Sequence, residues 1–234
     1  MSKYYYDLHI HSILSPCADI LMTPNNILNM AMLKGLDFIS ITDHNSVKQL
    51  PIMKELALSY DFVFVPGIEV TVKEDFDVLC YFKTLNLALE FGNVIESYLT
   101  DDWHGYTKEN QVITDIYDQD ETYYSKSLVK TNIAFKELQQ LVNTFDGLLV
   151  LAHIDRLESS VLNTYKLDEI TFDGIELQKK HLLRTKLLKE YDNYRILINS
   201  DAHDLYTISE KDSYFLLEEK TIDAFFNYMR SNNE

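Results

Sequence analysis

Short apolar runs rich in β-branched and aromatic residues recur along the chain, and segments with helical spacing follow most of them. Seven such runs predict strands: YYYDLHI, DFISIT, FVFVPGIEV, DVLCYF, GLLVLAHI, DGIELQ and RILINS. Five intervening segments predict helices: NNILNMAMLKG, SVKQLPIMKELALSY, LNLALEFGNVIESYL, IAFKELQQLVNTF and KKHLLRTKLLKEY. The alternation predicts an α/β fold around a parallel sheet, either closed into a barrel or left open.

Local signals mark the limits of some of these elements. Pro24 suits the first turn of the first helix, and Gly35 suits its end. Residues 221–229 have the spacing of a final amphipathic helix, and residues 231–234 are expected to fray.

One long connection stands apart from this pattern. Residues 100–131 are polar, acidic and aromatic without a clear period, and the segment is longer than usual connections in compact domains. We expect an insertion over a functional site or a mobile lid. The length of 234 residues otherwise predicts a single domain over residues 1–234.

Composition and charge narrow the class of protein. Hydrophobic residues make up 46% and charged residues 25%, which excludes a disordered or fibrous chain. The net charge of −16 disfavours broad docking onto a nucleic-acid backbone, although a local pocket for one phosphate is compatible with it. Because the opening MSKYYYDLHIHS lacks signal-peptide features and no apolar run is long enough to cross a bilayer, we expect a cytosolic protein without a membrane partner.

The two cysteines do not predict a disulfide in that compartment. Cys80 lies in the apolar run VLCYF and is expected to be a small buried hydrophobic residue. Cys17 lies close to the candidate chemistry, which leaves a ligand or redox role open beside an inert one.

Histidines gather where the predicted strands end. His9 and His11 are two residues apart, so both side chains project to one face, although an isolated pair of this kind is equally a pair of half-exposed polar residues. Of the seven histidines, five occupy strand-end positions: His9, His11, His44, His153 and His203. The whole constellation is a stronger indication of metal binding than any one member.

Acidic residues share these positions. Glu69 ends the third predicted strand, where a buried carboxylate needs a compensating cation. A salt bridge is the alternative, but no basic residue lies at the other strand ends before Arg156, which favours a metal. In a β/α barrel all these side chains would converge at the carboxyl ends of the strands.

Five segments resemble, in order, the motifs of the PHP (polymerase and histidinol phosphatase) superfamily of metal-dependent phosphoesterases. They are DLHIHS, GLDFISITDHNS, VPGIEVT, LAHIDR and INSDAH, and they extend from Asp7 to His203. The resemblance implies a distorted seven-stranded β/α barrel, similar to a TIM barrel, with a trinuclear site at the carboxyl ends of its strands.

The same resemblance implies which residues bind two or three divalent ions, such as Mn²⁺, Fe²⁺ or Zn²⁺. The first ion would take His9, His11, Glu69 and Asp201. The second would share Glu69 and add His153. The third would take His44 and His203, together with Asp19, which stands where the family often has an aspartate.

This chain departs from the family pattern at Asp77, where many relatives have a histidine for the second ion. A carboxylate at that position shifts the preference toward harder ions such as Mn²⁺ over Zn²⁺. The alternative is a second site that is weakened or empty.

Two further residues are candidates for catalytic roles. Arg156 suits bidentate binding of a phosphate, with an ordinary surface arginine as the alternative. Asp43 would orient a histidine or, equally, cap a loop. His104 in the insertion and His181, flanked by Lys179, Lys180 and Arg184, are assigned to no metal.

These features favour hydrolysis of a phosphoester. The hypothesis is that two ions about 3.5–4 Å apart share a hydroxide that attacks phosphorus in line. The acidity of the chain favours a small phosphomonoester, a nucleotide or a short oligonucleotide over long duplex DNA.

Two other classes stay open. A non-catalytic metal-binding or regulatory module is one, with Asp77 as its main support. Hydrolysis of a cyclic amide is the other, although no strand-end lysine is present to bridge two metals as a carbamate. The sequence does not determine the exact substrate or the oligomeric state.

Overall fold

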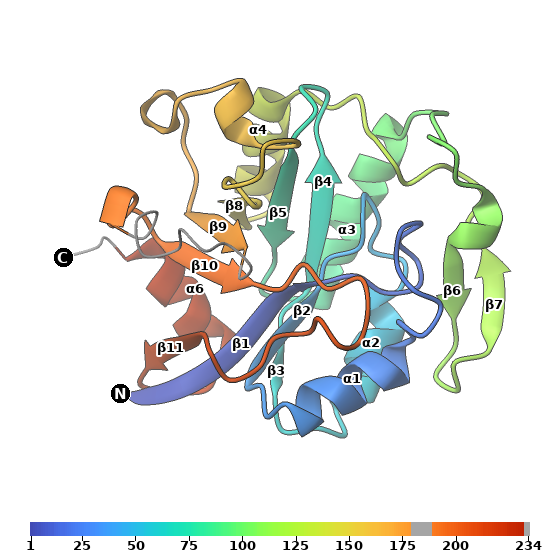
Figure 1. The fold of residues 1–234 in the computed structure, drawn as a ribbon, viewed down its shortest axis with the longest axis horizontal. Coiled ribbons are helices and arrows are strands. Elements are labelled where there is room, and N and C mark those ends of the chain that lie inside the picture. The colour runs from blue at the N-terminus through green and yellow to red at the C-terminus, as the bar shows by residue number, and fades with distance from the viewer. Residues whose placement is uncertain (179–188, 232–234) are drawn as a thin grey trace.

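Two main sheets and a separate hairpin organise the computed structural model, which describes residues 1–178 and 189–231 (Figure 1). The first sheet has the order β11-β1-β2-β3, and its strands are β1 (Ser2–Ile10), β2 (Phe38–Ile41), β3 (Val63–Phe64) and β11 (Tyr214–Leu217). The second has the order β10-β9-β8-β5-β4, and its strands are β4 (Gly67–Thr71), β5 (Asp77–Tyr81), β8 (Leu148–Leu151), β9 (Gly174–Gln178) and β10 (Ile196–Asn199). The α/β class expected from the sequence is confirmed.

Two isolated bridges join these sheets close to the carboxyl ends of their strands. Ile10 at the end of β1 pairs in parallel with Ala202, just beyond β10. His44, just beyond β2, pairs in parallel with Glu69 on β4. The two sheets therefore meet on both sides of one rim.

Helices connect the strands, and their limits follow local signals. They are α1 (Pro24–Leu33), α2 (Leu50–Ala57), α3 (Leu85–Ile95), α4 (Phe135–Thr144) and α6 (Ile222–Arg230). Pro24 opens α1 and Gly35 follows it with a φ of +66°, as the sequence predicted. Thr84 and Thr221 cap α3 and α6 by accepting hydrogen bonds from backbone amides. The helix predicted over residues 179–191 falls mainly outside the described residues.

The core has two parts because side chains alternate across the strands. On β5, Leu79 and Tyr81 pack with Leu8 in one apolar cluster, while Val78 and Cys80 belong to the cluster that includes the buried faces of α1, α2, α3 and α4. The buried position expected for Cys80 is confirmed. Helix α6 adds Phe225 and Phe226 to the cluster of Leu79 and Tyr81.

Strand direction corrects the expectation of a parallel sheet. Strand β5 runs antiparallel to both β4 and β8. The connection from β4 to β5 is a tight turn over residues 72–76, closed by the Val72 amide donating to the Phe76 carbonyl, and parallel neighbours need a far longer crossover. The start of β5, where Asp77 lies, is therefore at the same rim as the carboxyl ends of the other strands.

The third predicted run is two strands rather than one. FVFVPGIEV breaks at Pro66, so that β3 ends one sheet and β4 begins at the edge of the other. Proline supplies no backbone donor and interrupts the ladder there. Strand β11, which pairs antiparallel with β1, was not predicted.

The segment 100–131 carries the hairpin of β6 (Val112–Thr114) and β7 (Asp120–Tyr123), seen at the right-hand edge of Figure 1. The Gln49 amide exchanges two hydrogen bonds with the backbone of Thr114. Asp118 accepts hydrogen bonds from Thr23 and Asn25 at the start of α1. These contacts attach the hairpin to the body of the protein.

In the part of the chain that is described, every helix is too short or too polar to cross a bilayer.

Candidate metal centre

Side chains from six strands meet at the rim where the two sheets are bridged. Strand β1 ends in His9 and the adjacent His11, and β4 carries Glu69. The turns after β2, β8 and β10 contribute the remaining histidines and an aspartate: His44, His153, Asp201 and His203. Asp77 joins them because β5 is antiparallel. Nearly all of the residues singled out in the sequence thus lie together.

The first group comprises His9, His11, Glu69 and Asp201, all buried. His9 Nε2 lies 3.2 Å from Glu69 Oε1 and 3.1 Å from Asp201 Oδ1. His11 Nε2 lies 3.2 Å from Glu69 Oε2 and 3.0 Å from Asp201 Oδ1. Two imidazole nitrogens and two carboxylates therefore face one point.

The second group shares Glu69 and adds His153 and Asp77. His153 Nε2 lies 3.2 Å from Glu69 Oε1 and 3.6 Å from Asp77 Oδ2. The other oxygen of Asp77 accepts a hydrogen bond from Thr71 Oγ1 at 2.6 Å. Asp77 thus directs one oxygen toward the group.

The third group consists of His11, His44 and His203. The rings of His11 and His203 stack with centroids 4.1 Å apart, and the rings of His11 and His44 are 4.4 Å apart. His44 Nδ1 also lies 3.1 Å from Glu69 Oε2. Glu69 and His11 each belong to two groups, which is the arrangement expected of residues between neighbouring ions.

The donor set fits divalent cations. Glu69 Oε2 and His44 Nδ1 are both buried without a hydrogen-bond partner among the described residues, even though they lie 3.1 Å apart. His9 Nε2 and His11 Nε2 lie only 3.1 Å from each other. Close lone-pair donors that do not satisfy one another are suited to a shared cation, and imidazole and carboxylate together suit Mn²⁺, Fe²⁺ or Zn²⁺.

Charge in the first group is balanced by protons on the histidines. Burial disfavours the charged form of His9, but the carboxylates of Glu176 and Glu69 raise its pKa well above the usual value. Burial acts likewise on His11, yet the carboxylates of Asp201 and Glu69, each within 3.2 Å of its Nε2, raise its pKa to about 9. The charge of His9 in turn holds the pKa of Glu69 and of Asp201 well below their usual values, against the effect of burial. A cation would replace these protons.

The pKa values of the side chains outside the first group are shifted in other directions. Burial and the positive charge of His11 lower the pKa of His44 to about 3 and that of His203 to about 4. Both imidazoles are therefore neutral near pH 7. Burial and the neighbouring charge of Glu69 raise the pKa of Asp77 to about 6.

Asp43 acts on the site through serines. Its carboxylate accepts hydrogen bonds from the backbone and hydroxyl of Ser12, at 2.7 and 2.6 Å, and from Ser15 Oγ at 2.7 Å. Ser15 Oγ lies 3.0 Å from His11 Nδ1. Because the serine proton goes to Asp43, Ser15 can accept from a protonated Nδ1, which turns His11 Nε2 toward the first group.

Arg156 contacts the site from the turn after β8. Its guanidinium donates to Asp201 Oδ2, which also accepts from Gln178 Nε2 at 3.1 Å. A cavity of about 250 Å³ opens beside this pair, and its walls include Ser200 and His203. A small anionic group in this cavity would lie next to both the guanidinium and the His203 side chain.

Comparison with known proteins rests on three-dimensional structure, since no protein-family model and no curated protein matches the sequence. Two structures of endonuclease Q match with TM-scores of 0.72 and 0.70 at 21% identity. One is the lesion-specific endonuclease PfuEndoQ from Pyrococcus furiosus, and the other is a complex with a 27-mer duplex substrate with an abasic lesion at the active site. The matches cover 98% of this chain and 56% and 57% of the endonuclease chains, so this chain spans a little over half of their length.

Two further structures are described as phosphoesterases. A protein from Bifidobacterium adolescentis, named as a candidate metal-dependent phosphoesterase, matches with a TM-score of 0.59 at 16% identity over 98% of this chain and 97% of its own. A two-domain protein from Bacteroides vulgatus, described as containing a predicted PHP-like metal-dependent phosphoesterase, matches with a TM-score of 0.56 at 16% identity over 95% of this chain and 61% of its own.

The chain has the PHP-like fold. The resemblance indicated by the sequence motifs is thereby confirmed at the level of fold. Within the PHP-like fold of this chain, the three groups of side chains share one rim.

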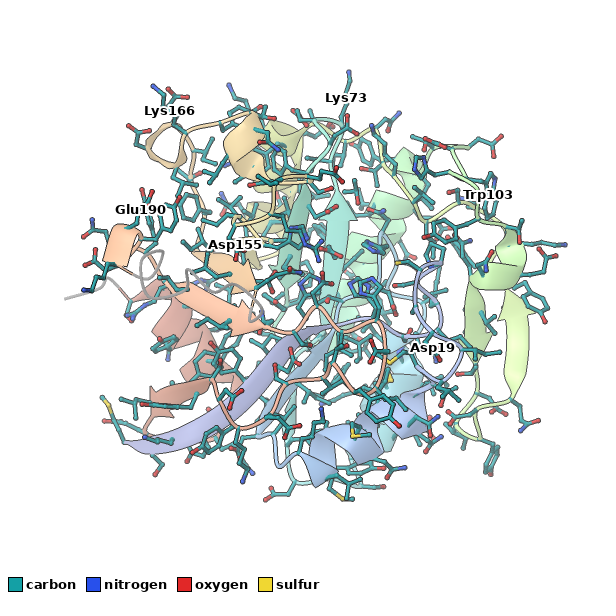
Figure 2. The ribbon with its side chains drawn as sticks, in the orientation of Figure 1. Asp19, Lys73, Trp103, Asp155, Lys166 and Glu190 are labelled. Carbon is teal, nitrogen blue, oxygen red and sulfur yellow. The ribbon has the colours of Figure 1, made fainter. Side chains whose placement is uncertain are left out.

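Asp19, a predicted ligand, and Cys17, for which a ligand or redox role was left open, both lie outside the three groups that the described residues form. Asp19 is exposed (Figure 2), its carboxylate accepts from the Leu21 amide, and its backbone amide donates to the His203 carbonyl. Cys17 is a free, exposed residue, and desolvation of its sulfur together with the charge of Glu69 raises the pKa of the thiol to about 12. A thiol that stays protonated is a poor ligand.

His104 lies in an exposed turn within the segment 100–131 and belongs to none of those groups of described residues. His181 lies outside the described residues. Figure 2 shows Trp103, the residue before His104, at the outer edge of the segment 100–131.

One buried carboxylate beside the first group was not identified from the sequence. Glu176 is fully buried on β9, 3.0 Å from His9 Nδ1. The signal was present in the run DGIELQ, where an acid occupies a position flanked by apolar residues of a central strand. The reasoning applied to Glu69, that a buried carboxylate requires a partner, applied equally here.

Proposed function

We propose that this protein is a metal-dependent phosphoesterase that uses up to three divalent ions at the rim of a distorted seven-stranded β/α barrel. The observation that carries the proposal is Glu69, a buried carboxylate within 3.2 Å of nitrogens from four histidines. Such a carboxylate is suited to bridging cations and has no comparable use in a purely structural core.

The barrel interpretation rests on the two bridges between the sheets. With them, the strands β1, β2, β4, β5, β8, β9 and β10 form a circuit that returns to β1. This number of strands agrees with the count that the resemblance implies. Catalytic groups gather at one rim in barrels of this kind.

The side chains divide the chemical work. His9, His11 and Asp201 would hold the first ion together with Glu69, and His153 and Asp77 would hold the second, also with Glu69. Bound divalent cations supply Lewis acidity that activates water and stabilises negative charge on phosphoryl oxygens.

Arg156 contributes a fixed donor at the edge of the site. Asp201 orients its guanidinium toward the rim, and the side chain keeps further N–H groups for a phosphate oxygen. Asp43 keeps His11 in its binding orientation through Ser15.

We propose a small phosphomonoester, a nucleotide or a short oligonucleotide end as the substrate. The cavity beside Arg156, about 250 Å³, suits one phosphate and a small attached group. The net charge of −16 is unfavourable for a long duplex, whose affinity depends on many basic contacts.

Cleavage of damaged DNA is the second candidate. A specific observation favours it, since one matched endonuclease Q structure holds a duplex with an abasic lesion at the active site. This chain corresponds to 57% of that protein, so lesion cleavage is included as an outcome of the test.

The test is phosphate release by metal-stripped protein reloaded with Mn²⁺, Fe²⁺ or Zn²⁺. The panel contains phosphomonoesters, nucleotides, short oligonucleotides and an abasic duplex, and strand cleavage is followed on a gel. We expect turnover of the small substrates. In His9→Ala this turnover should fall by at least about 100-fold, because loss of a ligand should cost no less than the upper limit for residues that only support ligands. His104→Ala, at an exposed histidine outside the three groups of the described residues, is the matched control and should keep full activity.

The other outcomes have separate meanings. Cleavage of the abasic duplex alone would favour the endonuclease. Metal binding without turnover of any substrate would contradict catalysis and favour a metal-binding regulatory module.

A further inference from the structure

Glu176 is a fully buried carboxylate that belongs to none of the three groups formed by the described residues. It lies on β9, between the parallel neighbours β8 and β10. A buried acid is retained only where donors surround it. The identity of those donors therefore indicates what the residue does.

The donors come from three separate parts of the rim. His9 Nδ1 on β1 lies 3.0 Å from both carboxylate oxygens. Asn199 Nδ2 on β10 donates to Oε1 at 2.7 Å. The backbone amide of His153, in the turn after β8, donates to Oε2 at 3.0 Å. Glu176 thus ties two of the candidate metal ligands to one central strand.

The contact with His9 selects its tautomer. A carboxylate accepts hydrogen bonds, so the proton of a neutral His9 ring resides on Nδ1. The lone pair is then on Nε2, the nitrogen that lies 3.2 Å from Glu69 and 3.1 Å from Asp201. A carboxylate behind a histidine ligand also increases its basicity toward a metal.

The contact with His153 holds a strained backbone. His153 has a φ of +27°, which is unfavourable for a residue with a side chain and persists only where neighbours enforce it. The Glu176 side chain accepts from the His153 amide, and the Glu176 carbonyl accepts from the next amide, that of Ile154, at 3.0 Å. With both amides fixed, His153 Nε2 is directed to within 3.2 Å of Glu69 Oε1.

We propose that Glu176 is a positioning residue for two metal sites at once, since it sets the tautomer of His9 and the backbone turn of His153. This inference rests on the proposed metal centre. Glu176 itself would contact neither ion; it would act through His9 of the first group and His153 of the second. Loss of its charge should therefore weaken binding at both.

The test is calorimetric titration of metal-stripped protein with Mn²⁺, in the wild type and in Glu176→Gln. The glutamine side chain has an NH₂ group in place of one carboxylate oxygen, and this group would face at least one of the three donors that now bind Glu176. We expect the affinity for Mn²⁺ to fall by about 10–100-fold, the range for residues that support metal ligands. The matched control is Asp173→Asn, earlier on the same segment, where the carboxylate accepts the Leu149 amide. The control should bind Mn²⁺ like the wild type, and wild-type affinity in Glu176→Gln would overturn the proposal.

A double variant separates positioning from a general structural role. If Glu176 acts partly through the imidazole of His9, Glu176→Gln should lower the affinity for Mn²⁺ by a smaller factor in the His9→Ala background than in the wild type. Equal costs in both backgrounds would contradict that part of the proposal.

A measurement on the wild type keeps the test valid if the glutamine variant does not fold. Nitrogen-15 NMR of the Zn²⁺-loaded protein should show a hydrogen-bonded proton on His9 Nδ1 and metal ligation through Nε2, and the opposite tautomer would refute the inference. Because none of these measurements uses a substrate, inactivity with intact metal binding would count against the proposed function alone.

Discussion

At the scale of single residues, the site is defined by two side chains that its three groups share. Glu69 serves two groups, and His11 also serves two. Each ring of the first group has its outer nitrogen held, His9 by Glu176 and His11 by Ser15. Orientation of this kind leaves the inner nitrogens available for a cation.

Asp77 is the residue on which metal preference should depend. Replacement by histidine, Asp77→His, exchanges an oxygen donor for a softer nitrogen donor, so we expect Zn²⁺ affinity relative to Mn²⁺ to increase by about tenfold. Competition of the two ions for metal-stripped protein, followed by elemental analysis, measures the ratio. Asp75→His, at an exposed position on the same turn, is the control and should leave the ratio unchanged. An unchanged ratio in Asp77→His would mean that this carboxylate does not bind an ion.

At the scale of elements, the site depends on two sheets that approach closely at the rim. Gly67 at the start of β4 makes this possible on one side. A Cβ atom there would lie 2.5 Å from Ser40 Oγ and 2.8 Å from Thr42 Cγ2, both on or next to β2. The distance between β2 and β4 is therefore set by the absence of a side chain two residues before Glu69.

Gly67→Ala should force these strands apart. We expect the free energy of unfolding to fall by about 1–3 kcal/mol, the usual cost of overpacking. Urea unfolding of the metal-stripped protein measures it. Ser40→Ala removes one of the clashing atoms, a hydroxyl that is itself buried without a partner in the described structure, so Gly67→Ala with Ser40→Ala should recover part of the loss. No recovery would show that the clash lies elsewhere.

At the scale of the whole molecule, folding gathers several carboxylates at one rim of a protein that is already acidic. In the metal-free state, protons on the histidines compensate the carboxylates. The stability of the whole fold therefore depends on pH and on metal in a linked way.

Metal-free protein should lose stability between about pH 6.5 and 9. The pKa of His11 is about 9 in the folded state and near 6.5 when unfolded, so its contribution is complete below pH 6.5 and is lost as pH rises through 9. His9 and His153 have raised pKa values and act in the same direction. We expect a loss on the order of 3 kcal/mol, measured by urea unfolding across this range.

Saturating Mn²⁺ should flatten that pH profile, because bound cations take over the role of the protons. His11→Asn, without metal, should lose less stability over the same range than the wild type does. A wild-type profile that is flat without metal would show that these histidines are neutral in the folded protein.

Local patterns were sufficient for much of the architecture and for most of the site. Pro24 and Gly35 delimit α1 because their backbone preferences act without distant contacts. Histidines and acids at predicted strand ends could be grouped in advance, since strand ends in an α/β fold share one face. Glu69 was identified because a buried carboxylate demands a cation wherever the chain places it.

The amino-acid sequence by itself determined the α/β class, most helix limits and the identity of the side chains gathered at the rim. Only the tertiary structure decided the direction of β5, the pairing of Arg156 with Asp201, the distance of the Asp19 carboxylate from the three groups and the use of Glu176. The physical reason is the separation along the chain of the residues that interact. Helix ends and strand alternation arise from neighbours along the chain, whereas hydrogen bonds such as that between His9 and Glu176 join residues 167 positions apart, and no local period encodes them.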